Sequence, residues 1–69
     1  MKEISIGTET IELGKFLKFG GLAQSGGQAK MWIEEGRVSV NGETETRRRK
    51  KLAPGDTVTC KGQTRKVIP

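Results

Sequence analysis

Residues 25–42 read SGGQAKMWIEEGRVSVNG, and this stretch decides the fold. It predicts a helix that begins at Ser25 or at a glycine beside it, because a serine oxygen can accept a hydrogen bond from a free amide of the first turn. Gly36 ends this helix, since glycine adopts the left-handed cap conformation without a steric penalty. The helix carries an apolar face at Ala29, Trp32, Ile33 and Gly36.

A short strand and a tight turn complete the stretch. Val38 and Val40 alternate with Ser39, which is the pattern of a half-buried strand. Asn41-Gly42 predicts a type I′ hairpin turn, because both central residues of that turn need a positive φ. The polar residues 43–46 that follow form at most an exposed strand.

Another helix precedes this stretch, over residues 11 to about 19. Thr10 can cap it through its hydroxyl, and Gly14 inside it would be explained by a close approach of two helices. Phe19 lies off the apolar face and is expected to pack under the N-terminal strand. That face consists of Leu13, Phe16, Leu17 and Gly20. Two short amphipathic helices joined by a glycine-rich turn predict a helical hairpin.

The rest of the chain predicts short strands around this hairpin. Residues 2–6, 57–60 and 63–68 have the composition or alternation of strands, and Pro54-Gly55-Asp56 reads as a turn. Leu52 is expected to return to the core. Sixty-nine residues allow one domain, which we take to span residues 1–69.

The composition favours a polyanionic partner over catalysis. Thirteen Lys and Arg against eight Asp and Glu give a net charge of +5, which suggests nucleic acid, although such a balance can also serve solubility alone. The chain has no His or Tyr, and Glu34 and Glu35 are too close in sequence to form a paired-carboxylate site. No spacing predicts a metal site, and no cofactor is expected.

Cys60 is expected to be a small buried hydrophobe. The N-terminus lacks the apolar segment of a signal peptide or membrane span, so we expect a cytoplasmic protein.

Two features could bind phosphate. Five consecutive cations, Arg47 to Lys51, precede Leu52 and therefore lie on an anchored loop; phosphate binding is favoured over a merely solvated loop, because the only nearby acids, Glu43 and Glu45, cannot neutralise all five. The start of the 25–36 helix offers free amides beside Gly26 and Gly27, which would suit an anion or merely make a turn. Trp32 is expected in the core, and it could stack on a base only if its edge were exposed.

The order of these motifs resembles the S4 RNA-binding domain. The resemblance rests on Leu13-x-Lys15-Phe16-Leu17, on Ser25-x-x-Gln28-Ala29-Lys30-x-x-Ile33-x-x-Gly36-x-Val38-x-Val40-Asn41-Gly42, and on Pro54-Gly55-Asp56. It covers residues 13 to about 60, and the short length is similar to the stand-alone YaaA/YbcJ type subgroup. It implies an α+β, αL (S4-like) fold, in which a two-helix hairpin packs on a small, mostly antiparallel sheet.

The resemblance also implies roles for residues. Lys15, Ser25, Gln28 and Lys30 match positions at the starts of the family's two helices, and Arg37 is expected on the same side. Glu12, Gly14 and Gly26 depart from the family's pattern. This suggests that positive charge has moved from the edge of the helical hairpin to the loop of Arg47 to Lys51, which we call the basic loop. The full predicted RNA-binding set is Lys15, Lys18, Ser25, Gly26, Gly27, Gln28, Lys30, Arg37, Asn41, Arg47, Arg48, Arg49, Lys50 and Lys51.

Together these observations predict a non-catalytic, monomeric RNA-binding protein. It would recognise structured RNA, ribosomal RNA foremost, through phosphate and shape, as a ribosome-associated or assembly factor with ribosomal proteins as further partners. One alternative is a protein-interaction adaptor whose basic loop binds an acidic partner. Another is a DNA-binding accessory factor, although no helix carries the side chains that read bases.

Overall fold

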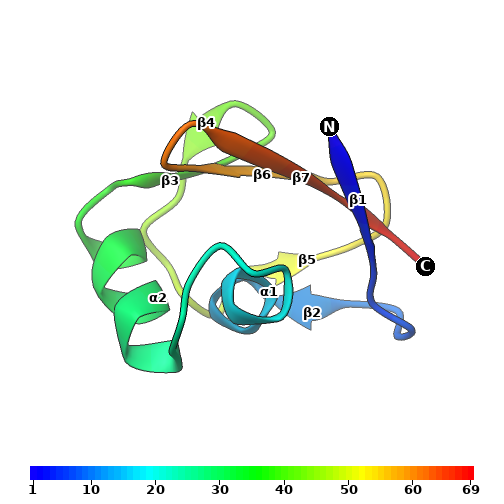
Figure 1. The fold of residues 1–69 in the computed structure, drawn as a ribbon, viewed down its shortest axis with the longest axis horizontal. Coiled ribbons are helices and arrows are strands. Elements are labelled where there is room, and N and C mark those ends of the chain that lie inside the picture. The colour runs from blue at the N-terminus through cyan, green and yellow to red at the C-terminus, as the bar shows by residue number, and fades with distance from the viewer.

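A computed structural model describes residues 1–69 as two helices on one face of a five-stranded sheet, with a separate pair of very short strands (Figure 1). The elements are β1 (Lys2–Ser5), β2 (Ile11–Glu12), α1 (Leu13–Phe19), α2 (Gly26–Glu34), β3 (Val38–Val40), β4 (Glu43–Thr44), β5 (Lys51–Leu52), β6 (Thr57–Cys60) and β7 (Gln63–Ile68). The larger sheet has the order β1-β7-β6-β3-β4, and only β1 and β7 pair in parallel. The predicted α+β architecture, a helical hairpin on a mostly antiparallel sheet, is confirmed.

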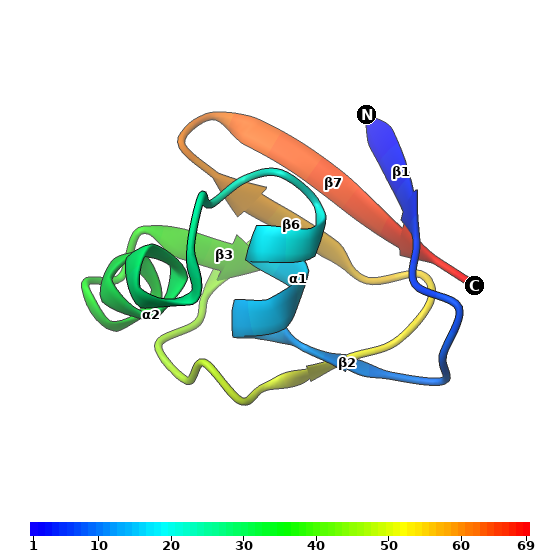
Figure 2. The ribbon, with the colours of Figure 1, turned by 60° about the horizontal axis from the view of Figure 1, so that its bottom comes forward.

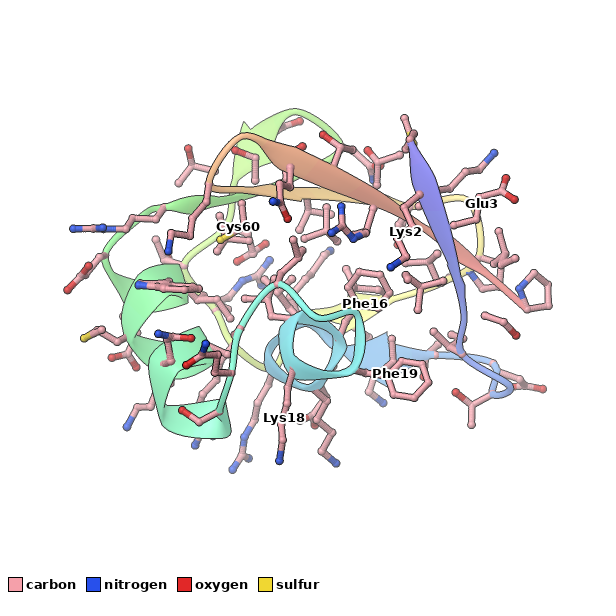
Figure 3. The ribbon with its side chains drawn as sticks, in the orientation of Figure 1. Lys2, Glu3, Phe16, Lys18, Phe19 and Cys60 are labelled. Carbon is pink, nitrogen blue, oxygen red and sulfur yellow. The ribbon has the colours of Figure 1, made fainter.

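The core lies between the hairpin and the sheet. Phe16 on α1 is fully buried and points toward the sheet, as Figure 3 shows, and Ile33 on α2 is buried to the same extent. Val38, Val58 and Leu52 close the core from the strands. The apolar faces predicted for the two helices therefore account for the packing of the hairpin.

The first helix is shorter than predicted. Ile11 and Glu12 form β2, which pairs with Leu52 and Lys51 of β5, and the helix begins only at Leu13. Thr10 does not cap it, because the residue before the helix is Glu12, which makes no side-chain cap. A two-residue strand pair of this kind has no sequence signal of its own, so the pattern alone favoured a longer helix.

Two other expectations for this helix need correction. A Cβ at Gly14 would lie 3.5 Å from the carbonyl oxygen of Arg48 and 4.0 Å from Ile33 Cδ1 on α2, so both the basic loop and the other helix lie against Gly14, and the loop is the nearer of the two. Phe19 does not pack under the N-terminal strand, since 61% of the residue is exposed.

The Asn41-Gly42 turn forms as predicted, with φ of 52° and 84°. The Asn41 side chain also accepts a hydrogen bond from the Thr57 amide at 2.9 Å and donates one to Asp56 Oδ1 at 3.1 Å. The residue therefore ties the turn after β3 to the turn before β6. The Lys61-Gly62 turn repeats the same backbone conformation between β6 and β7.

Candidate nucleic-acid interface

The basic loop lies against the start of α1, on the side away from β6 and β7 (Figure 2). The amide of Leu13 donates to the carbonyl of Lys50 at 2.8 Å, and the amide of Gly14 donates to the carbonyl of Arg48 at 2.9 Å. Two carbonyls of the loop thus cap the helix, in place of the predicted threonine. Leu52 anchors the far end of the loop in the core, so the backbone of the loop is held against α1.

The start of α2 is capped by its own side chains. Ser25 Oγ accepts from the amide of Gln28 at 3.1 Å, and Gln28 Oε1 accepts from the amide of Gln24 at 2.8 Å. This arrangement is a variant of the capping box, which the Ser25-x-x-Gln28 spacing could have revealed. Both predicted RNA contacts, Ser25 and Gln28, therefore have a structural role through their side-chain oxygens.

The amides of Gly26 and Gly27 remain free. Neither donates to any acceptor in the chain, and no atom lies within 4 Å of a Cβ placed at Gly26. An anion could therefore approach this end of α2 closely, where the helix dipole is positive.

These elements meet at a hollow of about 120 Å³, which we call the phosphate hollow. It lies between the starts of α1 and α2 and the basic loop, and its six lining residues are Glu12, Gly14, Lys15, Gly26, Lys30 and Arg48. Three cations against one carboxylate surround the open amide end of α2. The hollow thus combines charge, free donors and room, which is the chemistry of an anion site.

The other cations of the basic loop face different ways. Arg47 and Lys50 line a separate hollow that also contains Glu43 and Glu45, whereas Lys51 joins Lys15 in a third. The remaining cation, Arg49, is exposed and lines none of these hollows. The run that the sequence presents as one cluster is therefore divided among several surfaces.

A local ion pair fixes the beginning of this loop. Arg47 donates to Glu45 through Nε at 2.9 Å, through Nη2 at 3.2 Å and through its own amide at 3.0 Å. The side-chain hydrogen bonds from Arg47 are the main reason why the pKa of Glu45 is lowered to about 2. Because this pair takes up one positive charge, Arg47 is less available to phosphate than Arg48.

Lys18 extends from the exposed side of α1, away from the sheet, whereas Phe19 projects in a different direction, to the right of the helix in Figure 3. Both line a largely apolar hollow with Ile11 and Lys15. Lys15 therefore borders both this hollow and the phosphate hollow. We call the whole surface, from Gly26 through Lys15 to Phe19, the underside.

Arg37 does not join the underside. It follows α2 at the opposite end from Ser25 and pairs with Glu35, with an Nε–Oε1 distance of 2.8 Å. Asn41 is likewise engaged within the protein by Asp56 and Thr57.

Trp32 is buried, as expected, with 7% of the residue exposed. The Nζ atom of Lys61 lies 4.3 Å from the centroid of its ring, so a cation covers the indole. Trp32 therefore offers no free face for base stacking. Burial also raises the pKa of the Cys60 thiol, in keeping with the expected role of this residue in the core.

No group of three or more acidic, cysteine or histidine side chains is arranged to hold a metal ion. The helices also lack the length and apolar character needed to cross a membrane.

The sequence was compared with the models of known protein families. The model of the S4 domain matches residues 4–68, which is nearly the whole chain. The chain belongs to the S4 domain family. This S4 domain is 51% identical over 59 residues to the protein named "Probable ribosome maturation protein RlbA" of Bacillus subtilis (strain 168), a match that spans 86% of this chain and 83% of RlbA. It is 45% identical over 58 residues to YbcJ of Escherichia coli (strain K12), with 84% and 83% of the two chains covered.

Solved structures agree with this assignment. The solution structure of YbcJ from E. coli, described as containing an αL motif involved in RNA-binding, superposes with a TM-score of 0.76 and 41% identity over 100% of this chain and 89% of YbcJ. The 30S ribosomal protein S4e from Thermoplasma acidophilum superposes with a TM-score of 0.69 at 17% identity, over 83% of this chain and 30% of S4e. At that identity the likeness to S4e concerns the fold alone.

Proposed function

We propose that residues 1–69 act as a single RNA-binding domain that recognises structured RNA, ribosomal RNA foremost, through phosphate and shape contacts on the underside. The observation that carries the proposal is the phosphate hollow, where Lys15, Lys30 and Arg48 lie around Gly26 at the start of α2, whose first amides are free. Such a site recognises the backbone of RNA, because free amides and cations both bind phosphate oxygens.

The relatives support the same function. YbcJ is described as using its αL motif in RNA-binding, and RlbA is named for ribosome maturation. We extend this to a role for our chain as a ribosome-associated or assembly factor in the cytoplasm. The absence of histidine and the lack of a paired-carboxylate site support a non-catalytic role.

Salt dependence of binding is the first test. If four or five cations contact phosphate, the logarithm of the association constant should fall with the logarithm of salt concentration with a slope of about −3 to −4. Fluorescence anisotropy with labelled ribosomal RNA hairpins, duplex RNA and duplex DNA gives this slope for each ligand. A flat salt response, or equal affinity for duplex DNA, would contradict the proposal, and retention on no nucleic acid would favour the acidic-protein adaptor.

Single substitutions locate the site. Arg48→Ala keeps the backbone carbonyl that caps α1, so we expect the protein to remain folded. RNA binding should weaken, and the salt slope should become less steep by about one. Lys30→Ala should act in the same way. Arg37→Ala is the matched control, because it removes an exposed cation at the other end of α2 and should leave affinity for RNA nearly unchanged. Equal losses from Arg48→Ala and Arg37→Ala would show that overall charge, and not the phosphate hollow, governs binding.

A further inference from the structure

We propose that Phe19 forms a stacking site for an unpaired nucleotide next to the phosphate hollow. The inference rests on the proposed RNA binding by the underside, and it adds the class of RNA: a structured element with at least one unpaired base beside the bound phosphate.

The exposure of Phe19 sets it apart from the other aromatic residues. The chain has only three of them, and Phe16 and Trp32 are 0% and 7% exposed, whereas Phe19 is 61% exposed. The ring projects from the side of α1 in Figure 3, and it lines one hollow together with Lys18. A base could therefore reach it without any rearrangement of the core.

The surroundings of the ring match a nucleotide. Phe19 lines a hollow of about 560 Å³ with Ile11, Lys15 and Lys18. Its floor is apolar, as a base face requires, and its two lysines are suited to the phosphates on either side of that base. The positive rim distinguishes this occupant from an apolar peptide or a second copy of this chain, neither of which would gain from the lysines.

The hollow beside Phe19 adjoins the phosphate hollow, so one RNA chain could occupy both. Lys15 lines both hollows, and it precedes Phe19 by four residues on α1, so the two side chains are one helical turn apart on one face. An RNA chain with a phosphate between Lys15 and Arg48 would continue along α1 and reach Phe19. A base inside a duplex has both faces covered by its neighbours, so an unpaired base is the one best able to stack on this ring.

The test uses the whole chain and two RNA hairpins that differ only in four unpaired adenosines at the 3′ end. Phe19→Leu retains an apolar side chain but removes the aromatic face. We expect it to weaken binding to the tailed hairpin by about fivefold or more, and to leave binding to the blunt hairpin unchanged. Met31→Ala is the control, because Met31 is also exposed and apolar but lines none of the hollows. It should alter neither affinity.

A direct readout is the NMR signal of the ring. The tailed hairpin should shift the Phe19 ring protons by the ring current of the stacked base, while those of buried Phe16 stay in place. Equal effects of Phe19→Leu on both hairpins, or none on either, would overturn the stacking site. If Arg48→Ala still weakens binding in that case, the proposed RNA-binding function survives. A Phe19-dependent change in sedimentation or in vesicle binding, without one in binding to the tailed hairpin, would instead identify a self-association or membrane surface.

Discussion

Substitutions of Asn41 can distinguish an effect on protein stability from an effect on RNA binding. The sequence suggested it as an RNA contact, yet its side chain is bonded to Asp56 and to Thr57 within the protein. Its φ of 52° also places it in the left-handed region, which asparagine and glycine tolerate better than other residues. Substitution of Asn41 should therefore change stability and leave the intrinsic affinity for RNA unchanged.

The size of the effect follows from the hydrogen bonds that the substitution removes. Asn41→Gly keeps the positive φ but eliminates three exposed side-chain hydrogen bonds, two of them at 2.9 and 3.1 Å and a longer one from the Thr57 hydroxyl at 3.3 Å; a typical bond contributes about 0.5–1.5 kcal/mol net, and the long one less. We expect a loss of about 1–2 kcal/mol in the free energy of unfolding. Asn41→Ala should lose about 1 kcal/mol more, because a Cβ is strained in the left-handed region. A loss of about 1 kcal/mol lowers the midpoint of thermal unfolding by about 4–8 °C in a domain of this size.

Urea unfolding measures these differences, with the fluorescence of Trp32, the only tryptophan, as the signal. RNA affinity is then compared at a temperature where wild-type, Asn41→Gly and Asn41→Ala are all folded. The expected order of stability is wild-type, then glycine, then alanine, with equal affinities. Unchanged stability together with weaker RNA binding would refute the structural role of Asn41 and restore it as a contact.

Three further predictions concern other parts of the chain. Gly14→Ala should raise the free energy of unfolding by about 0.5 kcal/mol, because alanine favours helix and its Cβ would only touch Arg48 at 3.5 Å; a lower thermal midpoint would show that the basic loop cannot adjust. Burial raises the pKa of the Cys60 thiol, so a thiol reagent should react slowly with the folded chain and rapidly in urea, and fast labelling of the native protein would contradict its burial. The pKa of Glu45 is about 2 against an ordinary 4.5, so the pair with Arg47 stabilises the fold fully above pH 4.5 and is lost as the pH falls through about 2; an NMR titration of this carboxyl with a midpoint near 4.5 would contradict the pairing.

Much of the fold could be predicted because its signals are local. Ser25 begins α2, Gly36 follows its end in the left-handed conformation, and Asn41-Gly42 makes the hairpin turn. Each of these depends on residues a few positions apart, so a pattern in the chain suffices to find it.

The errors arise where distant segments meet. Ile11 extended the helical pattern of α1, but pairing with Leu52 makes it a strand. The reason for Gly14 was sought in the neighbouring helix, which does touch it through Ile33, but the nearest group belongs to Arg48, thirty-four positions later. Similarly, the sequence shows five adjacent cations, and only the packing of the loop on α1 reveals that Arg48 alone among them lines the phosphate hollow.

The two helices also differ in how their amide ends are used, which is why we propose the anion site at one of them and not at the other. Both α1 and α2 begin with amides that no helical carbonyl can satisfy. In α1, the amides of Leu13 and Gly14 donate to the basic loop, so this end holds the loop in place and has less capacity left for a ligand. In α2, Gly26 and Gly27 remain free. The basic loop is thus held against α1 and presents Arg48 to the open end of α2. The backbone of this loop is therefore as important to the proposed site as the charge of its side chains.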